Sequence, residues 1–169
     1  MYSYRAPSEF RADGGQRELA LATSGGVTEA GPAVHPRFFS GLLTEPAVAA
    51  AGMLAVAAVA RARYVTSASV VAQLLRDPVV TSNGDRLRFE SFSSCCGVYS
   101  RLDLLPGALD GAMLGTGTTN VDFGPAIRGA LAQVAGLDPM HLSVGLADAA
   151  AVKGRSRLAE EARRLQALM

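Results

Sequence analysis

The chain has 169 residues, of which 49% are hydrophobic and 18% are charged, and its formal net charge at pH 7 is +1. This length suits one domain with a buried core, and the balance of charge excludes a strongly basic surface that would hold the whole domain on nucleic acid or an anionic membrane. The two cysteines, Cys95 and Cys96, are adjacent, which excludes the spaced framework of a disulfide-rich secreted protein. Residues 1–10 lack the pattern of a signal peptide, so we expect a cytoplasmic protein.

The N-terminal segment, residues 1–36, is rich in Gly, Ser, Ala and Pro, a composition typical of loops. One short apolar run in it, residues 19–22, is interpreted as an edge strand. We expect residues 37–145 to form the core and residues 146–169 to form a divergent helical tail, all within a single domain of residues 1–169.

Two helices are predicted next in the chain. The first starts near Thr44, a suitable N-cap, has Pro46 in its first turn and continues to about residue 64. Its apolar part is shorter than the roughly 20 residues of a membrane span. The second covers residues 67–76, where valine and leucine side chains recur at helical spacing, and ends before Pro78. Together they are expected to form a helical hairpin.

The pair Asn83-Gly84 is the strongest local signal in the chain, because it tolerates the positive φ angles of a two-residue hairpin turn. It predicts antiparallel strands at residues 79–81 and 86–92. Alternation of polar and apolar side chains predicts a third strand over residues 96–104. The side chains expected to face the core are Leu87, Phe89, Val98, Leu102 and Leu104, and the opposite side of the third strand carries Tyr99, Arg101 and Asp103.

The C-terminal part is predicted to contain a helix from Pro125 to about residue 134, a strand at residues 141–144 and a final helix at residues 155–169. The predicted fold class is therefore α+β, with an antiparallel β-meander packed against an N-terminal helical hairpin and C-terminal helices.

The sequence contains no complete catalytic or metal-binding motif, so we expect no catalytic residue, metal or cofactor. The vicinal cysteines Cys95 and Cys96 have three interpretations: buried structural thiols, which we favour, a strained redox-responsive disulfide, or a zinc site shared with His35 and His141. The zinc interpretation is weak because no C-x-x-C or H-x-x-x-H spacing supplies a local chelate.

A Gly-Thr-Gly-Thr-Thr-Asn run extends from Gly115 to Asn120 and could present backbone amides to an anion. It lacks the lysine of a phosphate-binding P-loop, so a structural turn is the favoured interpretation. A small-ligand-binding protein or an enzyme that uses this loop remains an alternative function.

Two groups of residues are candidates for contact with a partner. The first combines arginine with an aromatic ring, which suits RNA but equally suits a helix end whose arginines favour the C-terminal dipole. The second forms one apolar stripe of the predicted final helix, which suits internal packing or docking in a partner's groove. The first group is Arg61, Arg63 and Tyr64. The second group is Leu158, Leu165 and Met169.

Several strings of the sequence together resemble the N-terminal region of bacterial SWIM zinc-finger family proteins. They are YSYRAPS (2–8), ATSGG (22–26), HPRFFSGLLT (35–44), RARY (61–64), DRLRFESFSSCCGVYSRLDLL (85–105), GTTNVDF (117–123) and LSVG (142–145). The resemblance covers roughly residues 2–145, and the family continues through a longer region that this chain lacks. The C-x-C and C-x-H signature of the SWIM zinc finger is absent from the chain.

The resemblance implies a role beside MoxR-type AAA+ ATPases and von Willebrand factor A domain proteins, which accompany members of this family. We therefore expect a non-enzymatic protein-interaction or scaffold domain of a multi-component ATPase-associated system. The alternative implied by SWIM domains in general is a nucleic-acid-associated module. No membrane partner is expected.

Overall fold

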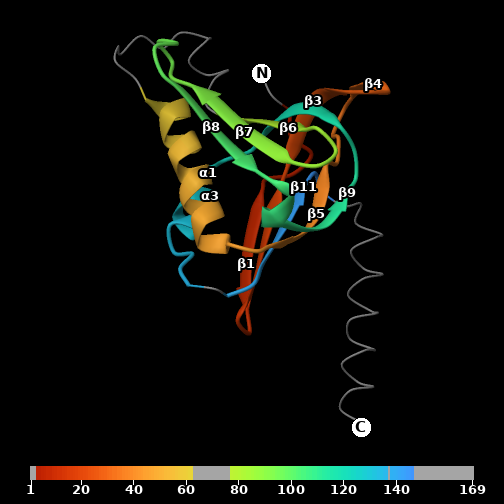
Figure 1. Ribbon diagram of the computed structural model, residues 1–169. Coiled ribbons are helices and arrows are strands. Elements are labelled where there is room, and N and C mark those ends of the chain that lie inside the picture. Colours follow the sequence, from red (N-terminus) through yellow and green to blue (C-terminus); the bar gives the residue numbers. More distant parts are fainter. Residues whose placement is uncertain (1–2, 63–76, 137, 147–169) are drawn as a thin grey trace.

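The computed structural model describes residues 3–62, 77–136 and 138–146 (Figure 1). Strands predominate in this mixed α+β fold. The elements in chain order are β1 (Glu9–Asp13), β2 (Gln16–Leu21), β3 (Thr23–Thr28), β4 (Gly31–Ala33), β5 (Phe39–Leu43), α1 (Pro46–Arg61), β6 (Val79–Ser82), β7 (Leu87–Phe92), β8 (Tyr99–Leu104), a 3₁₀ turn (Pro106–Ala108), β9 (Leu109–Met113), β10 (Gly117–Val121), α3 (Pro125–Leu131) and β11 (Met140–Val144).

The strands form two sheets. The five-stranded sheet has the order β1-β2-β11-β5-β9, with β2 and β11 parallel and the other neighbours antiparallel. The six-stranded sheet has the order β4-β3-β10-β6-β7-β8 and is antiparallel throughout. The chain passes from the first sheet to the second at Ala22, a buried residue between β2 and β3.

Helix α1 packs against β7 and β8 of the six-stranded sheet, and α3 packs against α1 and β1 (Figure 1). Pro46 occupies the first turn of α1, where its missing N–H costs no helical hydrogen bond. The helix buries Met53, Val56 and Ala57 at helical spacing. Ser91 of β7 donates a 2.5 Å hydrogen bond to the carbonyl oxygen of Val56, which joins the helix to the sheet.

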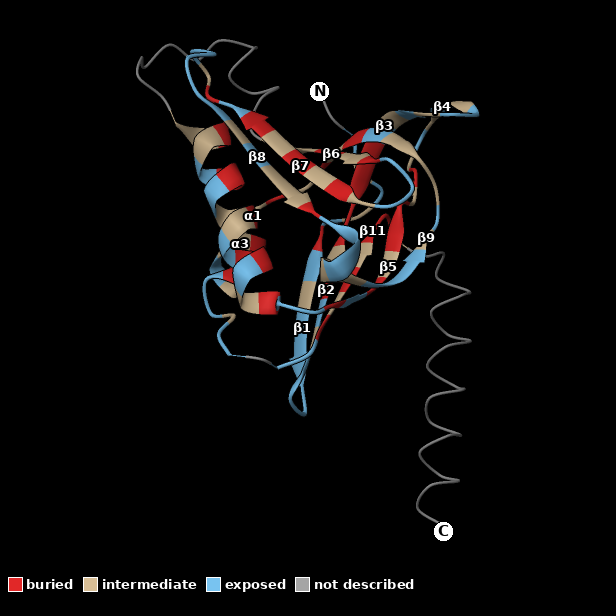
Figure 2. Ribbon diagram, viewed as in Figure 1, coloured by how far each residue is buried: buried red, intermediate tan, exposed pale blue. Residues whose placement is uncertain are grey.

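One buried cluster connects both sheets with both described helices (Figure 2). Its largest side chains include Phe39 from β5, Phe89 from β7, and Phe38 and Phe123 from connecting segments, all nearly inaccessible to solvent. Burial of a phenylalanine contributes about 2–3 kcal/mol of transfer free energy. These aromatic side chains therefore account for a large share of the stability of the fold.

The prediction that residues 1–36 are mostly loop is wrong, because this segment contains β1 to β4. The strand predicted at residues 19–22 is present as part of β2, but its predicted edge position is wrong, since β2 lies between β1 and β11 with Leu19 and Leu21 fully buried. One of the glycines that suggested loop, Gly26, has a packing role in β3. A Cβ atom at Gly26 would lie 2.4 Å from the carbonyl oxygen of Thr118 in β10, so only glycine allows this close strand approach.

The predicted meander is confirmed, because β6, β7 and β8 are consecutive antiparallel neighbours and Leu87 and Phe89 are buried together. The turn differs from the prediction. Ser82 pairs with Leu87, which leaves four residues in the loop, and only Gly84 has a positive φ, of 88°. Asn83 donates its backbone N–H to the carbonyl oxygen of Arg86 at 3.3 Å, which closes this longer loop.

The third strand begins at Tyr99, later than predicted, because residues 93–98 form the turn from β7 to β8. Val98 is exposed and the prediction that it faces the core is wrong. Leu104 is buried and Leu102 packs against the core, as predicted.

The predicted helix at Pro125 is confirmed as α3, which ends earlier, at Leu131, and the strand at residues 141–144 is confirmed as β11. The predicted loop at residues 115–120 is mostly strand, because β10 pairs with β3 on one side and β6 on the other. The predicted helices at residues 67–76 and 155–169 lie outside the described residues. The first of them was to form the second half of the predicted helical hairpin. Neither α1 nor α3 is long and apolar enough to cross a membrane.

Candidate interaction face

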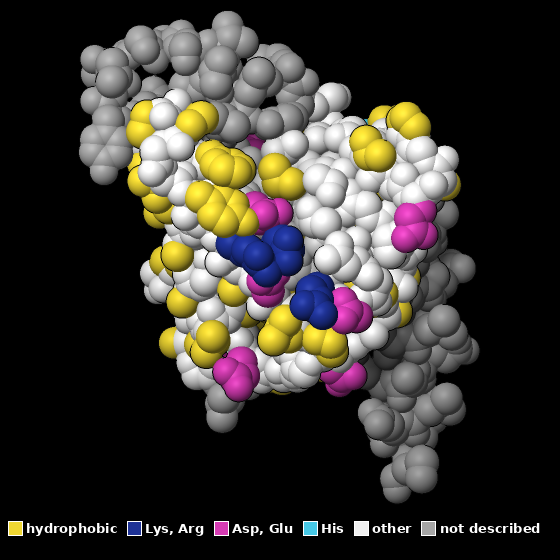
Figure 3. Space-filling view, turned by 45° about the horizontal axis from the view of Figure 1, so that its top comes forward, with side chains coloured by type: hydrophobic (Ala, Val, Ile, Leu, Met, Phe, Trp, Pro, Cys, Tyr) yellow, Lys and Arg dark blue, Asp and Glu magenta, His cyan; other side chains and the backbone are white. Residues whose placement is uncertain are grey.

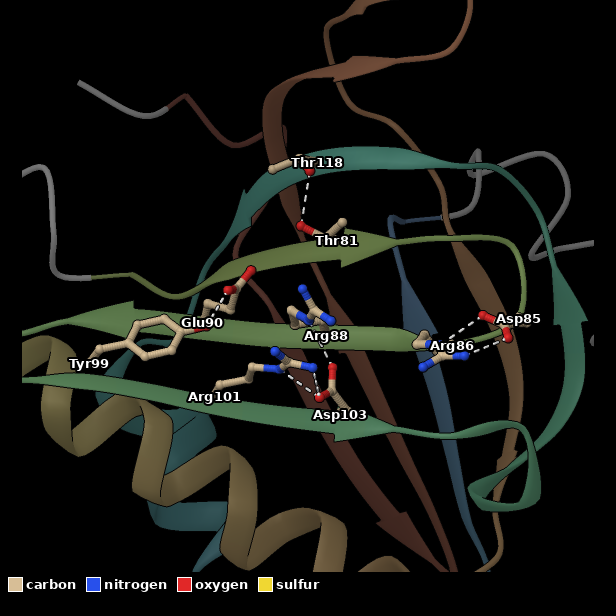
Figure 4. Close-up of polar contacts among 9 residues, drawn as sticks. All are labelled: Thr81, Asp85, Arg86, Arg88, Glu90, Tyr99, Arg101, Asp103 and Thr118. Atoms are coloured by element: carbon tan, nitrogen blue, oxygen red, sulfur yellow. Dashed lines mark hydrogen bonds and ion pairs between the residues drawn. The ribbon is translucent and has the colours of Figure 1, made fainter.

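The strands β7 and β8 separate two chemically different faces because successive side chains of a strand point in opposite directions. On the inner face, Leu87, Phe89 and Ser91 are buried on the side of α1. On the outer face, side chains from β6, β7, β8 and β10 lie together (Figure 4). We define the outer face as Thr81, Arg88, Glu90, Phe92, Tyr99, Arg101, Asp103 and Thr118.

The antiparallel register arranges the outer face in rows. The opposed pairs are Arg88 with Asp103, Glu90 with Arg101, and Phe92 with Tyr99. Directly opposed side chains on one face interact, and pairs of opposite charge or of aromatic rings each contribute roughly 0.2–1 kcal/mol. Every row of β7 and β8 on this face therefore joins complementary side chains.

Asp103 is the centre of the charged rows. Its carboxylate accepts a 2.8 Å hydrogen bond from Arg88 Nε and forms an ion pair with Arg101, whose Nη2 is 2.5 Å away. The Asp103 side chain is 20% exposed. Partial burial acts to raise the pKa of Asp103, but the hydrogen bonds and positive charges of the two arginines outweigh it and lower the pKa. The carboxylate is thus ionised at neutral pH and holds both guanidinium groups in place.

The aromatic row lies at the other end of the two strands. The rings of Phe92 and Tyr99 have centroids 5.0 Å apart and an interplanar angle of 37°. The Tyr99 hydroxyl donates a 2.5 Å hydrogen bond to Glu90 Oε1, and this hydrogen bond raises the pKa of Tyr99. Both rings remain about half exposed, so the pair presents apolar area next to fixed polar groups.

The face extends across β6 and β10, where the hydroxyl oxygens of Thr81 and Thr118 are 2.9 Å apart. Just before the start of β7, Arg86 Nε donates a 2.9 Å hydrogen bond to Asp85 Oδ1. Figure 3 shows basic and acidic side chains gathered beside hydrophobic ones on this surface of the molecule. The surface is therefore mixed in character, with charges of both signs close to exposed apolar groups.

The turn of residues 93–98 follows Phe92 and precedes Tyr99, at the aromatic end of the outer face. It contains Cys95 and Cys96, both exposed and both free thiols. The interpretation of these cysteines as buried structural thiols is therefore wrong. The predicted third strand began at Cys96, whereas both cysteines lie in the turn before β8.

The two histidines occupy separate hydrogen-bonding environments. His35 Nδ1 is 2.8 Å from the carbonyl oxygen of Thr23, and His141 Nε2 is 3.3 Å from the hydroxyl oxygen of Ser40. Within residues 3–62, 77–136 and 138–146, no three or more His, Cys, Asp or Glu side chains are grouped to hold a metal ion. The set of two cysteines and two histidines that the zinc interpretation requires is not assembled among these described residues.

Of the residues predicted to contact a partner, only Arg61 lies in the described part of the chain. It is half-buried at the end of α1, where its Nη2 donates to the carbonyl oxygen of Phe123 at 3.4 Å. That contact ties the helix to the segment before α3. The other five, Arg63, Tyr64, Leu158, Leu165 and Met169, fall outside the described residues.

Two shallow hollows mark the surface away from the outer face. One, of about 400 Å³, lies between β1 and α3 and is bordered by Phe10 and Ile127. The other, of about 310 Å³, lies beside Gly115 and Thr116 and includes Arg37 and Glu29. Neither contains a nucleophile hydrogen-bonded to a base, the arrangement on which covalent catalysis depends.

The alternation of residues 96–104 predicts that Tyr99, Arg101 and Asp103 share one side of a strand, but it does not predict their partners Arg88 and Glu90 on β7. The alternation of residues 86–92 was the signal that could have placed Arg88 and Glu90 on the same side of their strand.

Comparisons of the chain with protein-family models, with curated proteins and with solved structures found no match.

Proposed function

We propose that this protein is a non-enzymatic interaction domain and that the outer face is the surface with which it binds a protein partner. The observation that carries the proposal is the set of cross-strand rows on β7 and β8, which places two arginines beside two exposed aromatic rings. Arginine, tyrosine and phenylalanine are enriched in protein–protein interfaces, and Arg and Tyr are frequent among the residues that dominate binding energy.

The side chains of the outer face are held in position before any partner binds. Asp103 orients the guanidinium groups of Arg88 and Arg101, and Glu90 orients the hydroxyl of Tyr99. Ordering a flexible side chain on binding costs about 0.5–1.5 kcal/mol, so groups that are already oriented bind with less entropic loss. This preorganisation favours a docking role.

The balance of charge favours a protein partner over nucleic acid. On and beside the outer face, Arg86 faces Asp85, and Arg88 and Arg101 share Asp103. Phosphate binding depends on unneutralised positive charge, which these carboxylates reduce. A polar and apolar surface with charges of both signs better suits a protein with a complementary mixed surface.

The partner class that we propose comes from the resemblance of the chain to the N-terminal region of SWIM zinc-finger family proteins. It is a MoxR-type AAA+ ATPase or a von Willebrand factor A domain protein from the same genome. The domain would then act as an assembly or scaffold component of an ATPase-associated system.

The test is a binding titration of the full chain against each of these two purified proteins. The variant Phe92→Ser removes an exposed ring of the outer face, and Val34→Ser is the matched control, since Val34 is 75% exposed outside that face. Loss of an interface anchor costs 1–2 kcal/mol or more, so we expect Phe92→Ser to weaken binding by about tenfold and Val34→Ser to leave it unchanged.

Two other outcomes would contradict separate parts of the proposal. If neither protein binds the chain, the proposed partner class is wrong. If one binds but the two variants weaken it equally, the partner class stands and the assignment of the outer face is wrong.

A further inference from the structure

The turn of residues 93–98 is a well-anchored structure that holds two thiols in solvent. Its ends are joined by a 2.9 Å hydrogen bond from the backbone N–H of Ser93 to the carbonyl oxygen of Val98. Ser94 donates both its N–H and its hydroxyl to the carbonyl oxygen of Ala62, just after α1. The positions of Cys95 and Cys96 are therefore fixed by the fold from both sides.

Two donors converge on the sulfur of Cys95. Ser93 is fully buried, and its hydroxyl oxygen accepts the backbone N–H of Val98 at 3.0 Å and lies 3.3 Å from Cys95 Sγ. Because the oxygen already accepts one hydrogen bond, its proton is free to point to the sulfur. This hydrogen bond, followed by one from the backbone N–H of Gly97, lowers the pKa of Cys95. Hydrogen bonds to the charged form stabilise a thiolate.

Cys96 provides a second exposed thiol beside the first. Its φ of 56° is the one left-handed value among the described residues other than glycine, and its backbone N–H donates to the carbonyl oxygen of Ser93 at 2.8 Å. A turn conformation frees Cys96 from the alternation of a strand, which would have directed the two thiols to opposite faces. The neighbouring thiols are thus both accessible from the same solvent.

We propose that Cys95 and Cys96 form a reversible oxidation site, at which a peroxide oxidises Cys95 and Cys96 then closes a vicinal disulfide. Exposed, thiolate-stabilised cysteines next to a second thiol are the arrangement in which peroxide-sensing sites occur. The proposal goes beyond the interaction function and does not depend on it.

The chemistry takes place in two steps. The Cys95 thiolate attacks the O–O bond of the peroxide, so an S–O bond forms, the O–O bond breaks and the leaving hydroxide takes a proton to become water. The Cys96 thiolate then attacks Cys95 Sγ, so an S–S bond forms and the second hydroxide leaves and is protonated. Two thiols lose two electrons in total, the peroxide gains them, and two waters are released.

Adjacency makes the product easy to reverse. The Cα atoms of adjacent residues are about 3.8 Å apart across a trans peptide, shorter than the roughly 4.4–6.8 Å of ordinary disulfides. The strain of a closer pair favours reduction by a dithiol, and strained exposed disulfides are the labile ones. Oxidation at this site would therefore be transient in a reducing compartment.

The test treats the reduced full chain with hydrogen peroxide and follows its thiols by mass spectrometry and non-reducing electrophoresis. The chain contains only these two cysteines, so every thiol signal comes from this site. We expect the monomer to lose two hydrogens and to recover them with dithiothreitol. In Cys96→Ser we expect a sulfenic acid at Cys95 that dimedone traps, and in Cys95→Ser a reaction slower by about tenfold, since thiolate content sets the rate.

Both variants change exposed side chains, and circular dichroism checks that they fold. As a second readout, the alkylation rate of Cys95 in Cys96→Ser is measured against pH for the native and the urea-unfolded chain. We expect the native profile to rise at lower pH. Oxidation only to intermolecular dimers, faster reaction in Cys95→Ser than in Cys96→Ser, or identical native and unfolded profiles would each overturn the proposal.

Discussion

The inner and outer faces of β7 and β8 come from the same twelve residues but differ in what they do for the molecule. The inner face packs Leu87 and Phe89 against α1, where burial and close packing stabilise the fold. The outer face carries the charged and aromatic rows that no described element covers. In these strands residue parity separates the groups that stabilise the fold from the groups of the proposed binding surface, so that substitutions on one face leave the other face intact.

Two phenylalanines of β7 test this separation most strongly. Phe89 is 1% exposed and Phe92 is 45% exposed, although they lie three residues apart on one strand. We expect Phe89→Ala to lower the free energy of unfolding by about 3–5 kcal/mol through lost burial and a cavity, and Phe92→Ala by about 1 kcal/mol or less. Urea unfolding of both variants measures the difference, and similar losses would show that the faces are not separate in energy.

The turn before β7 determines how its residues are distributed between the faces. Gly84 has a φ of 88°, a left-handed conformation that a β-branched residue adopts only with strain. We expect Gly84→Val to destabilise the domain by about 1 kcal/mol or more, which the urea midpoint would report. A midpoint equal to that of the unsubstituted protein would mean that the loop relaxes to another geometry.

A smaller effect is expected from the charged rows. In the folded state the pKa of Asp103 lies below its ordinary value of about 3.9. Its ion pairs therefore stabilise the fold above that ordinary value, and this stabilisation is lost as the pH falls through the lowered pKa of the folded state. We expect Asp103→Asn to cost about 1 kcal/mol or less at pH 7, the range of exposed ion pairs, and the difference from the unsubstituted protein to shrink below pH 4. A difference that is constant from pH 7 to pH 3 would contradict this account of Asp103.

Local patterns predicted those elements whose signals are themselves local. The Asn83-Gly84 pair, the Pro46 and Pro125 helix starts and the alternation of residues 96–104 led to the meander, α1 and α3. The five-stranded sheet was missed because its strands pair across long sequence separations, with β11 inserted between β2 and β5. Strand β3 carries no local signal, since Gly26 in it is required by the close approach of β10.

The candidate face could be predicted only in part for a related reason. Parity identified Tyr99, Arg101 and Asp103, but the residues opposite them depend on the length of two turns. A two-residue turn at Asn83 and a strand that begins at residue 96 would have given another register. The exposure of Cys96 was missed in part through the same error, because the predicted third strand began at that residue.

Reversing one charge on the outer face and one charge elsewhere shows whether the outer face binds the partner. Arg101 on β8 and Arg11 on β1 each lie on an edge strand and pair with a carboxylate two residues away, Asp103 and Glu9. Arg101→Glu and Arg11→Glu therefore make the same chemical change on an edge strand, each beside a carboxylate. With folding checked by thermal denaturation, we expect Arg101→Glu to weaken binding of the MoxR-type ATPase or the von Willebrand factor A domain protein by at least about tenfold, and Arg11→Glu to change it by less than about twofold. Equal effects of the two reversals on a partner that does bind would contradict the claim.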